Sequence, residues 1–258
     1  MSKGKIICII IILTIIITAV ILLIIYQINL SNTEFENSLS NLSAAFTYTA
    51  HTGCMDTEEN SLDAIETGIK NGAQIVEFDV NFNESNDPIL SHDAPTGNEV
   101  TLEEAFKKVS EYDKIRVNVD LKNCNALEKI KTVAEKYGVL DRIFFTGVND
   151  EFLEYVQKAD LGIPYYLNVK IESKKKHDTE YIESLVQKVK ISGAIGINLN
   201  KDKASAELVE IFHKNGLLVS IWTVDKKKDM KKILCYFPDN ITTKNPKLLN
   251  ELIYGTEQ

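Results

Sequence analysis

Charged residues in two short segments of this chain share a spacing of two positions, and three of the four are carboxylates. Glu77 and Asp79 are two positions apart in an otherwise apolar run over residues 74–80. Asp120 and Lys122 repeat the spacing at the end of the next β-branched run. Residues two apart on a strand project from the same face. Like charges placed in this way need a cation between them, and their hard oxygen atoms suit Ca²⁺ or Mg²⁺ better than Zn²⁺.

Two histidines could supply acid–base chemistry beside that cation. His51 and His92 each belong to a short polar segment near the carboxylates in sequence. An imidazole with an ordinary pKa near 6.5 can take a proton from an attacking hydroxyl, and a second one can give a proton to the leaving alkoxide. The other histidines, His177 and His213, lie in Lys-rich or helical stretches without acids arranged around them, and we interpret them as structural or solvated.

Each of these residues also has an ordinary interpretation. A carboxylate pair at a strand end can be a solvated rim, and a lone histidine is more often a surface or core residue than a ligand. Lys122 could be a surface lysine beside its strand. All of these residues, however, lie at the ends of predicted strands, where α/β folds build their sites. Their joint occurrence favours a single site.

The order of the segments resembles that of the glycerophosphodiester phosphodiesterases. In that family the pattern runs HRG, E-N, E-x-D, H-D and T-L-E-E, with a later W-T-V segment. The matching segments here are His51-Thr52-Gly53, Glu59-Asn60, Glu77-Phe78-Asp79, His92-Asp93, Thr101-Leu102-Glu103-Glu104 and Trp222-Thr223-Val224. The resemblance covers about residues 46–250 and keeps both order and spacing.

The resemblance implies metal-dependent hydrolysis of glycerophosphodiesters to glycerol 3-phosphate and an alcohol. It implies that Glu77, Asp79 and Asp120 hold Ca²⁺ or Mg²⁺, which would neutralise a phosphodiester oxygen. His51 and His92 would be the acid–base pair. A glycerol hydroxyl beside the phosphate could be the nucleophile and give a cyclic intermediate.

Three further residues are expected around the phosphate. Lys122 would hold another phosphate oxygen. Trp222, the only tryptophan, would either form a wall against the alcohol or pack inside the fold. Thr52 occupies the position of the family's arginine, and a hydroxyl cannot replace a bidentate guanidinium. We therefore expect weak catalysis, and we expect Thr52→Arg to raise it.

Other departures from the pattern leave two alternatives open. Asp120 stands where the family usually has Glu, and Asp120-x-Lys122 resembles the related sphingomyelinase D and phospholipase D toxins. Residues 243–246 read Thr-Lys-Asn-Pro in place of T-D-x-P. The chain could thus be a phospholipase D-like enzyme acting on lysophospholipid or sphingolipid head groups. It could also be a weakly active or inactive barrel that binds phosphodiesters.

Alternating strands and helices are predicted after residue 45, and they give an α/β fold, a (β/α)₈ TIM barrel. Strands are expected near residues 46–51, 74–81, 115–121, 142–147, 163–169, 194–199, 217–223 and 240–243. Helices are expected near residues 60–71, 101–111, 125–137, 150–158, 178–191, 203–215, 226–236 and 246–253. In a barrel the candidate residues meet at the carboxyl-terminal face of the strands. The segment 81–90 is expected to be a turn that brings His92 back over the second strand.

The amino terminus carries a second decisive feature. Residues 6–26 contain no charge, and such a length can cross a hydrocarbon core of about 30 Å as one helix. Lysines precede this run and glutamates follow it, which places the barrel outside a cell membrane. A cleaved signal peptide is the main alternative. The expected segments are a cytoplasmic terminus (1–5), a single transmembrane anchor (6–28), a polar tether (29–45) and the barrel domain (46–258).

Charge and cysteine content limit the partners. The chain has a net charge of −8, and its first 28 residues hold two lysines and no acid, so the remainder is −10. Such an acidic domain is poorly suited to nonspecific binding of nucleic acid. The cysteines after the apolar run are odd in number, although Cys54 and Cys124 could pair. The sequence does not indicate an oligomeric state.

Overall fold

The computed structural model describes residues 3–255, and within the first helix it leaves the side chains of residues 3, 5–12, 28–32 and 34 undescribed. Two compact units make up the chain, Met1–Leu42 and Ser43–Gln258. The ends of the expected terminal segments, residues 1–2 and 256–258, lie outside the described residues.

The first unit is formed by helix α1 (Lys3–Ser40). The helix continues through most of the stretch that we expected to be a tether. In the part of the chain that the structure describes, we find no helix with both the length and the apolar character needed to cross a membrane. The transmembrane anchor expected over residues 6–28 is therefore not found there, and the side chains of residues 6–12 and 28 lie outside the description.

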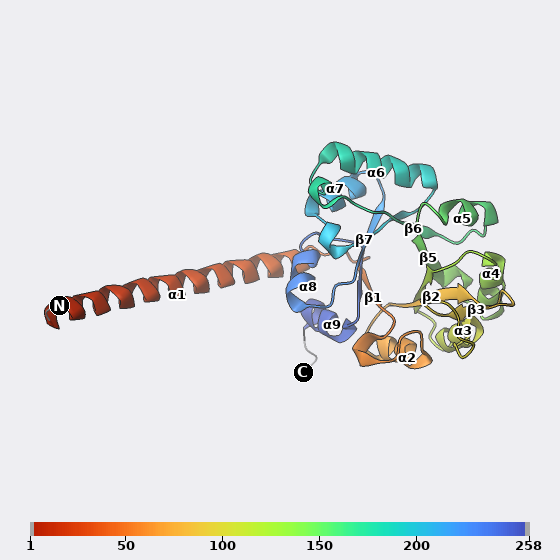
Figure 1. Cartoon of the computed structure of the whole chain (residues 1–258), viewed down its shortest axis with the longest axis horizontal. Coiled ribbons are helices and arrows are strands. Elements are labelled where there is room, and N and C mark those ends of the chain that lie inside the picture. Colours follow the sequence, from red (N-terminus) through yellow and green to blue (C-terminus); the bar gives the residue numbers. More distant parts are fainter. Residues whose placement is uncertain (1–2, 256–258) are drawn as a thin grey trace. The chain divides into compact units, whose positions relative to one another are not determined.

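The second unit is a closed barrel of eight parallel strands, which confirms the predicted fold (Figure 1). The strands are β1 (Thr47–Ala50), β2 (Ile75–Phe82), β4 (Arg116–Leu121), β5 (Ile143–Val148), β6 (Tyr165–Asn168), β7 (Gly196–Asn200), β8 (Leu218–Trp222) and β9 (Asn240–Thr243). Strand β1 pairs with both β2 and β9, and these two pairings close the sheet.

Helices α2 to α9 surround the strands (Figure 1). They are α2 (Leu62–Lys70), α3 (Leu102–Ser110), α4 (Leu127–Lys136), α5 (Leu153–Ala159), α6 (Thr179–Ser192), α7 (Ala206–Lys214), α8 (Lys227–Leu234) and α9 (Pro246–Tyr254). Helix α3 shows why such segments fold. Thr101 and Glu104 form a capping box at its start, and Leu102, Ala105 and Phe106 are buried on its inner face.

The turn that we expected within segment 81–90 is confirmed, and the structure adds paired strands on both sides of it. Strand β2 continues to Phe82, and β3 (Pro88–Leu90) pairs antiparallel to it. The Asn83 side chain accepts hydrogen bonds from the backbone N–H groups of Ser85 and Asp87, which closes a hairpin. The hairpin leads directly into the segment that carries His92.

Alternation along the strands separates the hydrophobic core from a polar interior. Phe78 of β2 faces outward, and its ring centroid lies 6.1 Å from that of Phe106 in α3. Glu77 and Asp79 of the same strand therefore face the barrel interior. Polar residues from most of the other strands line the interior as well. For example, Asn240 accepts a hydrogen bond from Thr49 Oγ1 at 3.0 Å.

Candidate active site

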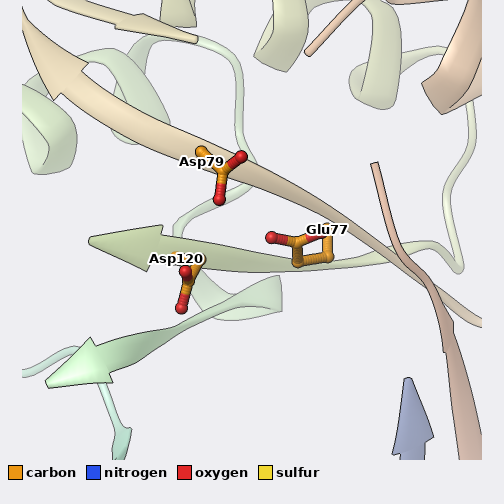
Figure 2. Close-up of side chains that lie close together, drawn as sticks. All are labelled: Glu77, Asp79 and Asp120. Atoms are coloured by element: carbon orange, nitrogen blue, oxygen red, sulfur yellow. The ribbon is translucent and has the colours of Figure 1, made fainter. Parts of the chain in front are cut away.

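The three candidate metal ligands converge at the carboxyl-terminal end of the barrel (Figure 2). Glu77 and Asp79 come from β2, and Asp120 comes from β4, where it pairs in register with Asp79. One oxygen from each carboxylate lies within 4.8 Å of the others. Glu77 and Asp79 are only 5 % and 2 % exposed. The parallel register of β2 and β4 therefore brings the three carboxylates together, as the sequence spacing predicted.

Hydrogen bonds hold each of these carboxylates in place. The backbone N–H of Thr52 donates to Glu77 at 2.8 Å. The side chain of Asn60 donates to Asp79 at 2.9 Å and accepts from its backbone N–H at 2.9 Å. Thr146 Oγ1 donates to Asp120 at 2.6 Å. These hydrogen bonds fix the orientation of the carboxylates, and their oxygen atoms keep further lone pairs for a cation.

The cluster fits a hard divalent cation. Its donor set consists only of carboxylate oxygens, which Ca²⁺ and Mg²⁺ prefer. Burial is the largest influence on Glu77 and raises its pKa, and Asp79 and Asp120 act in the same direction, whereas His51 opposes them. A bound cation would remove this penalty because it stabilises the charged carboxylates.

Lys122 lies beside two of the carboxylates. Its Nζ is 2.9 Å from Asp79 Oδ1 and also forms an ion pair with Asp120. Burial favours a lower pKa for Lys122, but the two acids outweigh it and raise the pKa above its usual range. Lys122 is therefore a fixed positive charge at the site. In this structure Lys122 neutralises Asp79 and Asp120. Its expected contact with a phosphate oxygen stays a prediction.

His51 directly follows β1 and faces the carboxylates. Its Nδ1 is 2.9 Å from the carbonyl oxygen of Thr52 and 3.9 Å from Glu77 Oε2. Because a carbonyl oxygen can only accept, Nδ1 carries a hydrogen and Nε2 is left to exchange protons. Burial favours a lower pKa for His51, yet Glu77, the Thr52 carbonyl and Asp79 together raise it.

His92 follows the β2–β3 hairpin and lines the same cavity as His51. Its side chain is 63 % exposed, and its Nδ1 lies 2.9 Å from Asp93 Oδ1. This contact engages Nδ1, so Nε2 is the ring nitrogen left to exchange a proton. The two histidines thus differ in environment, one being mostly buried and the other open to solvent.

One cavity of about 520 Å³ brings these residues together. Its lining includes both histidines, the three carboxylates, Lys122, Trp222 and a set of uncharged polar residues. The uncharged polar members are Asn118, Thr146, Asn149, Asn168, Asn198 and Thr242. Asparagines in the middle of strands gave no chemical signal in the sequence, so we did not predict this polar wall.

Thr52 is placed differently from our expectation. It is 2 % exposed and is absent from the cavity lining. Its hydroxyl accepts a hydrogen bond from the backbone N–H of Asn60. Thr52 therefore supports two metal ligands, Glu77 through its own N–H and Asp79 through Asn60. An arginine has no hydroxyl to accept from Asn60 N–H, so Thr52→Arg would remove that bond and keep the backbone bond to Glu77. The expected gain in catalysis from Thr52→Arg stays a prediction.

Thr52→Val should weaken the site without touching a metal ligand. The change keeps the shape of the side chain but leaves the partly buried N–H of Asn60 without its acceptor, which costs about 1 kcal/mol of unfolding free energy. Loss of an outer support should also lower Ca²⁺ affinity by about 10–100-fold. Thermal unfolding and calorimetric Ca²⁺ titration measure both effects. Thr52→Ser keeps the hydroxyl and should restore most of the affinity, and equal losses in both variants would contradict the role.

Two other site residues were missed as functional positions. Asn60 belongs to the E-N segment, so the signal was present, but its bridge to Asp79 depends on a left-handed backbone with φ 57°. Gly147 lies where β5 approaches β4, and a Cβ there would come within 2.3 Å of the Leu121 carbonyl oxygen. Its φ of 75° also favours glycine. This close approach brings Thr146 to Asp120.

The cysteine pairing that we considered is not formed. Cys54, Cys124 and Cys235 are all free thiols. Cys54 is buried, and burial raises its pKa to about 11. These three cysteines therefore contribute no disulfide to the site.

A parallel barrel with a buried carboxylate cluster and two histidines at one mouth has the groups that phosphodiester cleavage needs, a site for a divalent cation and two acid–base side chains. The profile of the glycerophosphoryl diester phosphodiesterase family matches this chain over residues 43–111 and 94–248. The chain belongs to that family and is a phosphoric diester hydrolase.

Known relatives agree with this assignment. A glycerophosphodiester phosphodiesterase of Caldanaerobacter subterraneus subsp. tengcongensis is 23 % identical over 238 residues, which are 79 % of this chain and 96 % of the relative. Two solved structures share the fold. A putative glycerophosphoryl diester phosphodiesterase of Silicibacter pomeroyi has a TM-score of 0.68 and 17 % identity, with 81 % of this chain and 92 % of that chain covered. A phosphodiesterase of Oleispira antarctica in complex with the product sn-glycerol-3-phosphate has a TM-score of 0.65 and 18 % identity, with 84 % and 98 % covered.

Proposed function

We propose that the protein hydrolyses glycerophosphodiesters to glycerol 3-phosphate and an alcohol, and that it requires Ca²⁺ or Mg²⁺. The observation that carries the proposal is the cluster of Glu77, Asp79 and Asp120, whose oxygens lie within 4.8 Å of one another in the cavity shared with His51 and His92. The product named for the Oleispira antarctica structure is consistent with it.

The residues divide the chemistry between them. A divalent cation at the three carboxylates would neutralise a phosphodiester oxygen and polarise the phosphorus. Lys122 supplies a second positive charge next to Asp79 and Asp120. One histidine accepts the proton of the attacking hydroxyl as its oxygen bonds to phosphorus, and the other donates a proton to the alkoxide as its bond to phosphorus breaks. When water attacks, this step gives glycerol 3-phosphate directly; when the neighbouring glycerol hydroxyl attacks, water then adds to the cyclic phosphate and breaks its new P–O bond to give the same product.

The decisive experiment measures product release by the purified full chain. Glycerophosphocholine, glycerophosphoglycerol and lysophosphatidylcholine are each supplied with Ca²⁺, with Mg²⁺ or with chelator. We expect glycerol 3-phosphate from the first two only when a divalent cation is present. Preference for the lysolipid would instead indicate the phospholipase D-like alternative, and turnover of none would indicate a phosphodiester-binding barrel.

We further propose that the apolar run over residues 6–26 anchors the chain in the cell membrane with the barrel outside. The proposal is supported by the absence of charge in that run and by the lysines before it. The anchored chain should sediment with membranes after alkaline carbonate extraction, and protease added to intact cells should cleave the barrel. Release of the full-length chain by carbonate would overturn the proposal.

A further inference from the structure

The cavity wall holds two buried polar atoms without a partner. Among the described residues these are the side-chain oxygen Oδ1 of Asn198 and the indole Nε1 of Trp222. Both residues line the active-site cavity, and Asn198 is only 6 % exposed. Leaving buried polar atoms unpartnered costs free energy, so such atoms are uncommon in folded proteins. Both atoms belong to side chains that line the substrate cavity, which makes a polar group of the substrate their candidate partner.

The orientation of the Asn198 amide follows from its neighbours. The backbone N–H of Gly147 lies 3.2 Å from Asn168 Oδ1, and because an N–H only donates, this Asn168 atom must be its oxygen. The same oxygen lies 3.2 Å from the Asn198 amide, so Asn198 must present its NH₂ group there. Oδ1 of Asn198 therefore remains as an acceptor in the cavity wall.

The acceptor on Asn198 and the indole donor on Trp222 come from different levels along the strands. Asn198 and Trp222 lie on the adjacent strands β7 and β8, and Trp222 pairs with Asn200. Trp222 is thus two residues nearer the mouth of the barrel, a rise of about 7 Å along the strand. The wall offers an acceptor at the deeper level and a donor above it.

We propose that Asn198 and Trp222 form a hydroxyl-binding subsite that recognises the polyol of the substrate, with Asn198 as a specificity-determining residue. A hydroxyl group can donate to Asn198 Oδ1 and accept from Trp222 Nε1, whereas an alkyl chain would leave both atoms unpartnered. Two neighbouring hydroxyls on one short carbon chain can bind the two residues together, one at Asn198 Oδ1 and the other at Trp222 Nε1. The proposal rests on the proposed function, since the phosphate has to lie at the carboxylates.

Binding by titration calorimetry tests the subsite independently of turnover. The full chain with Ca²⁺ is titrated with glycerol 3-phosphate, 1,2-propanediol 1-phosphate and n-propyl phosphate, which carry two, one and no free hydroxyls. We expect the wild type to bind glycerol 3-phosphate about 10–100-fold more tightly than n-propyl phosphate. Asn198→Leu has a similar shape without polar atoms, and it should reduce this preference to less than about threefold.

Two further variants make the result specific. Trp222→Phe keeps a ring but removes the N–H donor, and it should also reduce the preference. Asn149→Ser changes another cavity asparagine, whose Oδ1 already accepts from the N–H groups of Glu151 and Phe152, and the preference should persist. Circular dichroism confirms folding of each variant.

The outcomes separate this inference from the proposed function. Equal binding of the three phosphates by the wild type, or an unchanged preference in both Asn198→Leu and Trp222→Phe, would overturn the subsite. Glycerophosphocholine is assayed on the same preparation. If the protein prefers the hydroxyl-bearing phosphates but does not hydrolyse glycerophosphocholine, the proposed hydrolysis is rejected and the subsite is supported.

Discussion

Glu77→Gln should lower turnover of glycerophosphodiesters by at least about 10²-fold, because the loss of metal-based charge stabilisation is worth several kcal/mol. Glutamine keeps an oxygen that can accept the hydrogen bond from Thr52 N–H, so the local structure should persist. The variant should also bind Ca²⁺ much more weakly in calorimetry. Full activity in chelator, with no metal in the protein by elemental analysis, would refute the metal assignment.

The same variant makes a prediction about stability. Burial raises the pKa of Glu77 from 4.5 to about 7. Because the folded state holds this proton more tightly than the unfolded state, Glu77 contributes stability at low pH and loses it as pH rises from about 4.5 to about 7. Without metal, the wild type should therefore lose stability relative to Glu77→Gln across that window. Saturating Ca²⁺ should reverse the difference, since the cation binds the folded wild type.

The barrel was predictable because its signals are local. Each strand is a short β-branched or aromatic run, and each helix is amphipathic, so the alternation of period two and period 3.6 is visible in the sequence. The carboxylates were predictable for the same reason, because the i, i+2 spacing of Glu77 and Asp79 fixes their common face. The parallel order of the strands then brings Asp120 beside Asp79.

The supports of the site were not predictable from local pattern. Whether Thr52 faces the phosphate or the protein depends on the loop after β1, where Asn60 adopts a left-handed conformation. The hairpin formed by β3 depends on side-chain hydrogen bonds of Asn83 to its own loop. The polar wall that includes Asn198 depends on the barrel being closed. These features arise from contacts between segments, for which the sequence carries no periodic signal.

His51 offers the second large effect, and two substitutions can separate its chemistry from its structural hydrogen bond. His51→Ala removes the whole imidazole and should lower turnover by about 10²–10⁴-fold, the usual range for a lost general acid or base. His51→Asn places an amide NH₂ near the position of Nδ1, so it can keep the bond to the Thr52 carbonyl while lacking Nε2. If proton transfer by Nε2 is what matters, both variants should be similarly slow.

The pH dependence supplies an independent test of His51. Its pKa is raised because Glu77, the Thr52 carbonyl and Asp79 outweigh burial, which acts in the opposite direction. In the metal-free protein, NMR titration of the His51 imidazole should therefore give a pKa above 6.5, the ordinary histidine value. In metal-free Glu77→Gln, one negative charge 3.9 Å from Nδ1 is lost, so the pKa of His51 should be lower than in the wild type. A His51 pKa that is unchanged in Glu77→Gln, together with full activity in His51→Asn, would show that His51 only supports the loop and that another group takes the proton.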